Sequence, residues 1–438
     1  MKYLKSALSL VQKDDFFYLI LKKFSGAFPI KLIGVICTFG ISIYISRTFG
    51  SNGTGIYSLT NKIIQTVVLI SLFGSNTYVV KFVAQFKSSN KLLFVNNKLI
   101  SLLIYVLTNG FFLTFLLYFF SEGILKLFNN FEIVKPLSVA IFSIIPITIL
   151  RYFSAAFNGK MHVVLSTFLN SLFTPLIVII SIAIALVFEI RLGLVNVFYL
   201  FVCSNLFVCL ISMIIWFNQL PLKNLNLNLN VGKNVMKTYH FFFINFSVFF
   251  STAINFFIID FFIDTKNVGL FAIALNLGNI LKLIHVIIGK SLSPVIIDLI
   301  HNKKKLEKLL QKVSKILFYF CFLLFIFFLI FGKFILSIWG EEFVHSFNCL
   351  IIIVLAQLVN IISGYTGLLL INLGHEKLTS KISFFMVPLS ILISLLIIPR
   401  YGIIGASLSI AFSIILENII KYIFVKRKLN INPIKLFR

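Results

Sequence analysis

Residues 194–217 read LVNVFYLFVCSNLFVCLISMIIWF, a run of 24 residues without a charged side chain. A helix needs roughly 20 mostly apolar residues to cross a bilayer, so this stretch predicts a membrane span. The remaining chain is similar, because 59% of its 438 residues are hydrophobic, 12% are charged and the mean hydropathy is +1.04. Such a composition excludes a cytosolic enzyme, a secreted disulfide scaffold and a disordered chain, and it indicates a protein that crosses the membrane many times.

Apolar runs of similar length recur along the whole sequence. They predict an all-α integral membrane protein with about twelve transmembrane helices. The runs cover residues 28–46, 56–74, 99–120, 133–150, 163–188, 194–217, 241–263, 268–288, 313–338, 347–373, 378–398 and 403–425.

The basic residues alternate between the loops in a way that predicts the topology. The chain has 39 Lys and Arg against 13 Asp and Glu, which gives a formal net charge of +26. With the N-terminus in the cytoplasm, about 28 of the 39 basic residues fall in cytoplasmic segments and seven on the opposite side. Since cytoplasmic loops carry an excess of Lys and Arg, both termini are expected in the cytoplasm. Most of the charge therefore marks topology and does not call for a nucleic acid partner.

Two halves of the sequence repeat at an offset of about 209–215 residues. Gly55-Ile56-Tyr57 matches Gly269-Leu270-Phe271, residues 158–160 match 373–375, and residues 191–194 match 400–403. Because each half has six spans, the halves are predicted to be parallel, pseudo-symmetric six-helix lobes, an arrangement typical of alternating-access transporters. The predicted parts are an N-lobe over 1–217, a cytoplasmic linker over 218–239, and a C-lobe with a basic tail over 240–438. Residues 3–27 are expected to form an interfacial segment before the first span.

The sequence has no motif that indicates catalysis. The predicted loops are short, and no HExxH, P-loop, paired Asp motif or Ser/His/Asp set occurs. The five cysteines stand singly in apolar stretches, without metal-binding or redox spacing. We expect a protein that is not an enzyme and uses no cofactor beyond a coupling H⁺ or Na⁺.

Several motifs resemble those of bacterial polysaccharide flippases, and together they cover nearly the whole chain. The motifs are SRTFGSNGTGIYSL at 46–59, LFG at 72–74, FVAQ at 82–85, DTKNVGLF at 264–271, LSP at 292–294, IWGEEF at 338–343 and PRYGIIGA at 399–406. The resemblance is to the polysaccharide transport branch of the multidrug/oligosaccharidyl-lipid/polysaccharide (MOP) exporter superfamily, and within it to O-antigen flippases of the Wzx type.

This resemblance implies a location, a substrate and partners. Such proteins move undecaprenyl-diphosphate-linked sugar repeat units across the bacterial inner membrane. The implied partners are that lipid-linked glycan, the membrane lipids, and a polysaccharide polymerase with its chain-length regulator.

Charged side chains within the predicted spans are candidates for the substrate site, because a charge at the centre of a span costs about 2.5–3.5 kcal/mol. The excess is cationic and suits a diphosphate headgroup, since Lys and Arg can offset its desolvation. The candidates for a cationic cavity are Lys62, Lys282, Arg47, Lys290 and Arg151. Lys62 and Lys282 are expected to face each other across the lobe interface. Arg151 is equally explained by snorkelling to lipid phosphates, and Arg47 by a packing or salt-bridge role.

Three further residues are candidates for ion coupling. Asp260 and Asp264 are spaced i, i+4, which predicts that both point the same way from the seventh span. A buried carboxylate can bind Na⁺ or a proton, although a salt bridge to a cavity lysine explains Asp260 as well. His285 lies three residues from Lys282 on the same predicted helix face; it is a candidate for a proton role or a packed histidine.

Two other functions stay open from the sequence. A multidrug/cation antiporter of the same superfamily should favour acidic cavity residues, and the cationic excess speaks against it. A membrane polysaccharide polymerase would be expected to carry a large outer loop, which the chain lacks.

Overall fold

The computed structural model describes residues 15–85, 92–126, 131–218, 235–236, 238–299 and 302–434. Within these ranges every regular element is a helix, as predicted. The elements are α2 (Asp15–Leu72), α3 (Ser75–Gln85), α4 (Leu92–Lys126), η1 (Phe131–Ile133), α5 (Val134–Ala140), η2 (Ile141–Ser143), α6 (Ile144–Gly159), α7 (Val163–Thr167), η3 (Phe168–Phe173), α8 (Thr174–Val187), α9 (Leu194–Phe217), α11 (Tyr239–Phe262), α12 (Thr265–Asp298), α13 (Lys303–Ser337), η4 (Glu341–Ser346), α14 (Phe347–Ile362), α15 (Thr366–Asn372), α16 (Glu376–Phe424) and η5 (Val425–Leu429). Most of the predicted linker, the first residues of the expected interfacial segment and the end of the basic tail lie outside the described residues.

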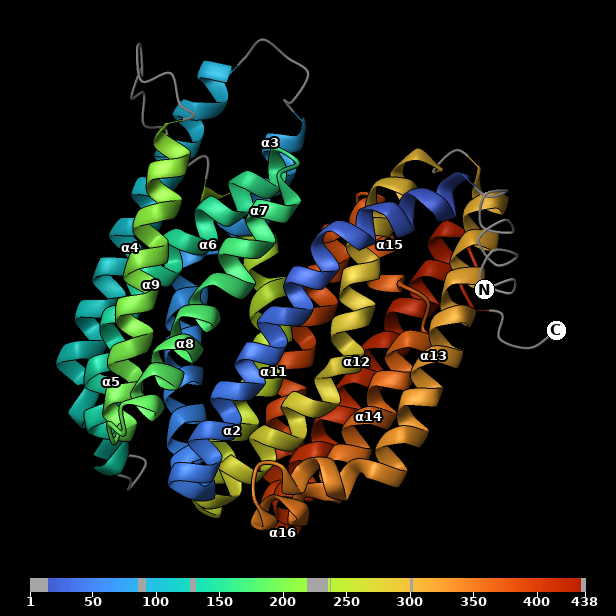
Figure 1. Ribbon diagram of the computed structural model, residues 1–438. Helices are drawn as coiled ribbons and strands as arrows, with labels where there is room; N and C mark the ends of the chain where they lie inside the picture. The colour runs from blue at the N-terminus through green and yellow to red at the C-terminus, as the bar shows by residue number, and fades with distance from the viewer. Residues whose placement is uncertain are drawn as a thin grey trace.

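Over the described residues, ten helices are long and apolar enough to cross a membrane, and two of them, α2 and α16, each cover two of the predicted crossings. Helix α2 reverses at Gly50 and helix α16 reverses at Gly402, as Figure 1 shows. The backbone φ angles are 67° and 60°, in the left-handed region that glycine adopts without a steric penalty. The apolar runs 28–46 and 56–74 predict a loop over 47–55, whereas the structure has helix on both sides of a one-residue break. We call the end of the molecule at Gly50 and Gly402 the kink end.

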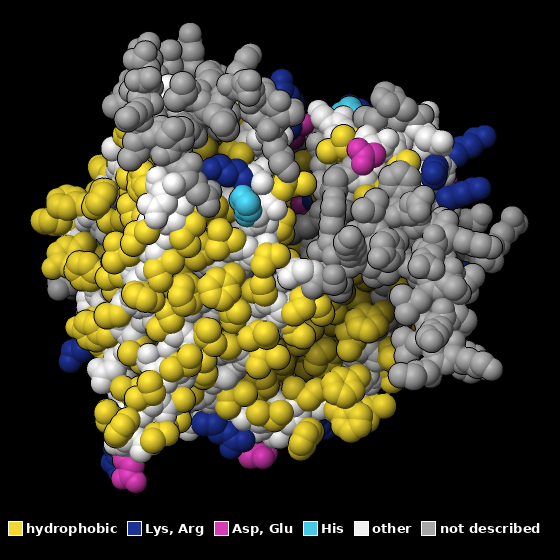
Figure 2. Space-filling view, turned by 45° about the horizontal axis from the view of Figure 1, so that its top comes forward, with side chains coloured by type: hydrophobic (Ala, Val, Ile, Leu, Met, Phe, Trp, Pro, Cys, Tyr) yellow, Lys and Arg dark blue, Asp and Glu magenta, His cyan; other side chains and the backbone are white. Residues whose placement is uncertain are grey.

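The two halves of the chain form two helical bundles. In Figure 1 the bundles meet near the kink end and diverge toward α3, α7 and α15, which we call the wide end. Large apolar side chains cover the outside, among them Phe119 at 69% exposure and Val187 at 78%. Figure 2 shows hydrophobic side chains across the middle of one face, with charged side chains toward its edges. This distribution is the one expected of a protein whose middle is solvated by lipid.

The bundles touch backbone to backbone where α2 crosses α12. A Cβ atom on Gly55 would lie 2.0 Å from the carbonyl oxygen of Thr265, and one on Gly269 would lie 2.0 Å from that of Ser51. Small residues allow such close approach between membrane helices. The pairs 51/265 and 55/269 are separated by the same 214 residues as the Gly55-Ile56-Tyr57 match, so the sequence repeat appears in space as a reciprocal contact.

We predict that Gly55→Ala and Gly269→Ala each destabilise the protein by about 1–3 kcal/mol, because the added methyl group forces the two backbones apart. The thermal unfolding midpoint in detergent should fall for both variants. The matched control is Gly123→Ala, since nothing lies within 4 Å of a Cβ atom there. An unchanged midpoint for both crossing variants would show that α2 and α12 are not held at this distance.

Candidate functional site

Two lysines lie between the bundles. Lys62 is on α2, and its Nζ lies 4.6 Å from the centroid of the Phe256 ring and 5.6 Å from that of Phe249, both on α11. Lys282 is on α12, and its positive charge acts on Lys62. Both residues are half-buried. Lys62 and Lys282 thus lie on the two helices that cross at Gly55 and Gly269, near enough for their like charges to repel each other at low dielectric.

A carboxylate that is not among the sequence-predicted candidates acts on Lys282. Glu417 on α16 accepts hydrogen bonds from Lys421 Nζ at 2.6 Å and Ser383 Oγ at 3.0 Å, and it also feels the charge of Lys282. It is the single carboxylate in the run 403–425, so the rule that a charge within a span needs a reason would have found it. Because Lys421 neutralises Glu417 directly, the neighbourhood of Lys62 and Lys282 keeps a positive balance.

A chain of amide side chains continues from this carboxylate into the C-terminal bundle. Asn418 Nδ2 donates to Asn360 Oδ1 at 3.0 Å, Asn360 Nδ2 to Gln357 Oε1 at 3.2 Å, and Gln357 Nε2 to Asn279 Oδ1 at 3.4 Å. Ser363 Oγ donates to Asn418 Oδ1 at 3.0 Å. The chain connects α16, α14 and α12, so the wall beside Lys282 is polar and internally hydrogen-bonded.

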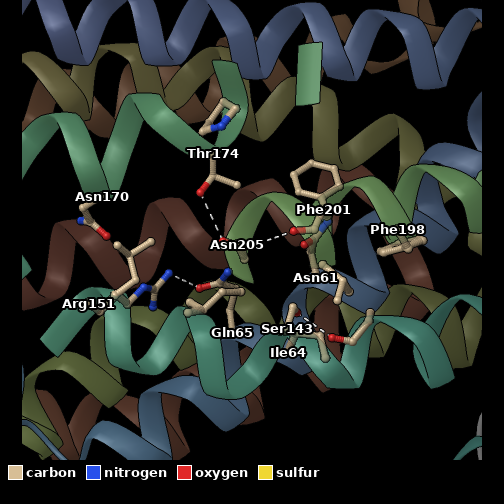
Figure 3. A pocket seen from close by; sticks show the side chains of 15 residues that line it. Asn61, Ile64, Gln65, Ser143, Arg151, Asn170, Thr174, Phe198, Phe201 and Asn205 are labelled. Atoms are coloured by element: carbon tan, nitrogen blue, oxygen red, sulfur yellow. Dashed lines mark hydrogen bonds between the residues drawn. The ribbon is translucent and has the colours of Figure 1, made fainter. Parts of the chain in front are cut away.

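The N-terminal bundle holds a separate cavity of about 170 Å³ (Figure 3). Arg151 on α6 points into it and donates from Nη2 to Gln65 Oε1 on α2. Its guanidinium is therefore engaged inside the protein, and snorkelling to lipid phosphates does not describe it. Lys62 is not among the residues that line this cavity, so Arg151 and the lysine pair occupy different places.

Arg47 contacts the end of a helix in the other bundle. It is exposed at the kink end, where Nε donates to the carbonyl oxygen of Ile338 at 2.9 Å and Nη2 to that of Ser337 at 2.8 Å. It thus caps the C-terminus of α13, where a cation is favourable. The side chain of Lys290 lies outside the described residues.

Two more contacts join the bundles at the kink end. Glu342 accepts hydrogen bonds from the backbone N–H of Ser51 at 2.6 Å and from its Oγ at 2.7 Å. Trp339 Nε1 donates to Ser42 Oγ at 3.0 Å. The motifs at 46–59 and 338–343, far apart in sequence, therefore form one interface with Arg47, which we call the kink-end contact.

The two aspartates do not point the same way, because α11 ends at Phe262 before the second of them. Asp260 is buried and accepts a hydrogen bond from Thr265 Oγ1 at 2.5 Å. Asp264 is the N-cap of α12 and accepts from the Asn267 backbone N–H at 2.6 Å. A helix cap explains Asp264 without ion coupling, whereas Asp260 stays a candidate.

His285 packs in the C-terminal bundle. Its ring stacks on that of Tyr365 with the centroids 4.1 Å apart, and the Tyr365 hydroxyl donates to the His285 carbonyl oxygen at 3.1 Å. Across the described part of the chain, no group of three or more His, Cys, Asp or Glu side chains is placed to hold a metal ion.

Comparison with known proteins gives a family match and similar folds. Residues 20–300 match the model of a family described as polysaccharide biosynthesis protein. The fold is similar to an inward-facing multidrug resistance MATE transporter of the MOP superfamily, with a TM-score of 0.72 and 12% identity over 93% of this chain and 98% of that chain. It is also similar to the lipid II flippase MurJ in an inward closed conformation, with a TM-score of 0.71 and 16% identity over 92% and 87%. A MOP superfamily transporter from Pyrococcus furiosus aligns with a TM-score of 0.68 and 11% identity over 94% and 95%. A search of curated proteins finds no match to the chain.

We predict that Arg47→Ala with Glu342→Ala shifts the protein toward states in which the kink end is open. Each lost hydrogen bond is worth about 1 kcal/mol, which suffices to change populations when several are lost together. The measurement is the distance between spin labels at Lys135 and Tyr401, both exposed and on different bundles, in a background with the five cysteines replaced.

The matched control is Arg191→Ala with Glu189→Ala, which removes the same charges from an exposed loop at the kink end. We expect longer label distances only in the first pair of substitutions. Identical distance distributions in the two double variants would mean that the kink-end contact does not hold the bundles together.

Proposed function

Because the chain belongs to the polysaccharide biosynthesis protein family, we propose that it is a flippase that moves an undecaprenyl-diphosphate-linked oligosaccharide, an O-antigen or related repeat unit, across the bacterial inner membrane. The observation that carries this proposal is the pair of like charges, Lys62 and Lys282, between the two bundles. Two neighbouring ammonium groups in a membrane protein are unfavourable by themselves. A diphosphate between them would turn that repulsion into attraction.

The surroundings of the lysines support an anionic headgroup over a cation. Lys62 lies over two phenylalanine rings, which exclude water and leave the ammonium free of a carboxylate partner among the described residues. Glu417, the carboxylate whose charge acts on Lys282, forms an ion pair with Lys421. Charge-assisted hydrogen bonds to phosphate oxygens are among the strong ones, and more so at low dielectric.

Alternating access between the bundles supplies the mechanism. The kink-end contact joins the bundles at one end, while they diverge at the other (Figure 1). Exposed lysines such as Lys303 and Lys304 lie in a segment that the positive-inside rule assigns to the cytoplasm. In the proposed cycle the headgroup enters from the wide end, and the kink-end contact breaks to release it on the other side, while the polyprenyl tail stays in lipid.

A multidrug antiporter is the second candidate function, because the fold is equally similar to MATE transporters. Such a protein binds cationic drugs, which the two lysines would repel. Resistance of cells that express the chain to cationic drugs, with normal surface polysaccharide after its deletion, would favour this candidate.

We predict that Lys62→Ala with Lys282→Ala abolishes surface polysaccharide while the protein stays in the membrane, because the anionic headgroup then crosses without compensating charge. Polysaccharide would be measured on cells in which the variant replaces the native chain, alongside immunoblots of membranes. Lys62→Arg with Lys282→Arg keeps the charges and should retain most of the activity.

The matched control is Lys303→Ala with Lys304→Ala, which removes two exposed charges. Normal polysaccharide in the Lys62/Lys282 double variant, or an equal loss in the control, would contradict the assignment of the pair to the headgroup.

We further predict that Asp260→Asn weakens the dependence of transport on an ion gradient, whereas Asp264→Ala lowers stability by removing the α12 N-cap and leaves that dependence intact. Asp260 is buried beside the α11–α12 turn, and Asp264 only caps α12. Transport in vesicles with and without imposed H⁺ or Na⁺ gradients distinguishes the two. Full transport with unchanged ion dependence in Asp260→Asn would remove this residue from coupling.

A further inference from the structure

The cavity in the N-terminal bundle contains a cation without a counter-ion. Over the residues that the structure describes, Gln65 Oε1 is the one hydrogen-bond acceptor of the Arg151 guanidinium, and no carboxylate lies within 4.0 Å of it. A guanidinium has five N–H donors, so most of its donors remain for a ligand. Holding such a group inside a membrane bundle is costly unless an anion joins it.

The rest of the lining can hydrogen-bond to hydroxyl groups. It supplies amide and hydroxyl side chains from several helices: Asn61 and Gln65 from α2, Ser143 from η2, Asn170 from η3, Thr174 from α8 and Asn205 from α9. Asn61 and Asn205 each use one N–H on a backbone carbonyl, of Tyr57 and Phe201, and keep a second donor. Such a set can both donate and accept, which matches a sugar ring.

Aromatic side chains complete the lining. Phe198 and Phe201 line the cavity and both pack against Tyr57, with ring centroids 5.6 and 5.7 Å from it. Figure 3 shows Arg151 and Asn170 toward one side of the cavity and the two phenylalanines toward the other. An apolar wall opposite hydrogen-bonding groups fits a ligand with C–H groups on its faces and hydroxyls on its edges.

The backbone departs from the regular α-helix at the same place. Residues Phe168–Phe173 form a π-helix, and Asn170 is in it. Since π-helical turns are uncommon and occur frequently at functional sites, this is an independent indication that the cavity has a role.

We propose that the cavity binds one sugar residue of the transported headgroup and that this residue carries a carboxylate, which Arg151 recognises. The inference rests on the proposed function. The volume of about 170 Å³ is below the 300–1,000 Å³ of sites for drug-sized molecules, so it suits a single ring. Asn61 and Gln65 lie within a turn of Lys62 on α2, which lets a sugar occupy the cavity while the diphosphate lies at the lysines.

The test measures binding of two free glycosides to the full chain in lipid nanodiscs. Methyl glucuronide and methyl glucoside share a ring and differ in the carboxylate. By saturation-transfer NMR titration, the wild-type chain should bind the glucuronide about tenfold more tightly, since its carboxylate gains charge-assisted hydrogen bonds that the glucoside lacks. Arg151→Gln should abolish this preference, and the exposed-charge control Lys303→Ala with Lys304→Ala should leave it unchanged.

A second variant covers the case in which Arg151→Gln does not fold. Asn170→Asp places a competing carboxylate at an exposed position of the lining, and it should also abolish the preference. Arg151→Lys should retain part of it.

Equal binding of the two glycosides by the wild-type chain would overturn the proposal, and so would a preference that survives Arg151→Gln. A preference that survives Arg151→Gln but is lost in Lys62→Ala with Lys282→Ala would place the carboxylate at those two lysines instead. Because free glycosides need no transport to bind, uronide binding in a chain that moves no lipid-linked substrate would contradict the proposed function and leave the sugar site standing.

Discussion

The close crossing of α2 and α12 determines where the other parts of the molecule lie. Gly55 and Gly269 bring the two backbones into contact, so the bundles share a fixed point from which both helices run on. Lys62 lies about 10 Å beyond Gly55 along α2, and Lys282 about 20 Å beyond Gly269 along α12. At the repeat offset of 214, their counterparts are Asn276 and Val68. The cation pair is therefore an asymmetric addition to a symmetric frame, which favours a functional origin over inheritance from the repeat.

The kink-end contact uses helix termini as its charged partners. Arg47 meets the carbonyl end of α13, and Glu342 meets the amide of Ser51 just after the Gly50 break. The helix dipole favours a cation at the C-terminus of a helix and an anion at its N-terminus, as found here. The contacts of Arg47, Glu342 and Trp339 all connect one bundle to the other at the kink end, so a rocking motion breaks them together. Hydrogen bonds of about 1 kcal/mol each give a closed end that is stable yet reversible.

The sequence predicted the crossings well because apolar length is a local property, and the positions of Gly50 and Gly402 fell within predicted loops. The sequence did not predict the direction of a side chain where that direction depends on a neighbouring helix. Asp264 turned out to be a cap because α11 ends two residues earlier, and Arg47 binds a helix end 290 residues away. Glu417 differs from these, because its isolation in an apolar run marks it in the sequence itself. The amides that line the N-terminal cavity are unremarkable in sequence, because only folding places them around Arg151.

Segment 61–65 of α2 connects the two places where a headgroup would be recognised. Lys62 faces the phenylalanines of α11, while Asn61 and Gln65 line the cavity in the N-terminal bundle. One short stretch of a rigid helix thus presents a cation and, about 60–100° further round its surface, two amides. Any rotation of the N-terminal bundle carries both together, so the distance between an anion at Lys62 and a sugar in the cavity would stay constant through a transport cycle. Selectivity for the sugar could then be kept in both access states, while the C-terminal bundle, with Lys282 and the paired Glu417, changes its position relative to the anion.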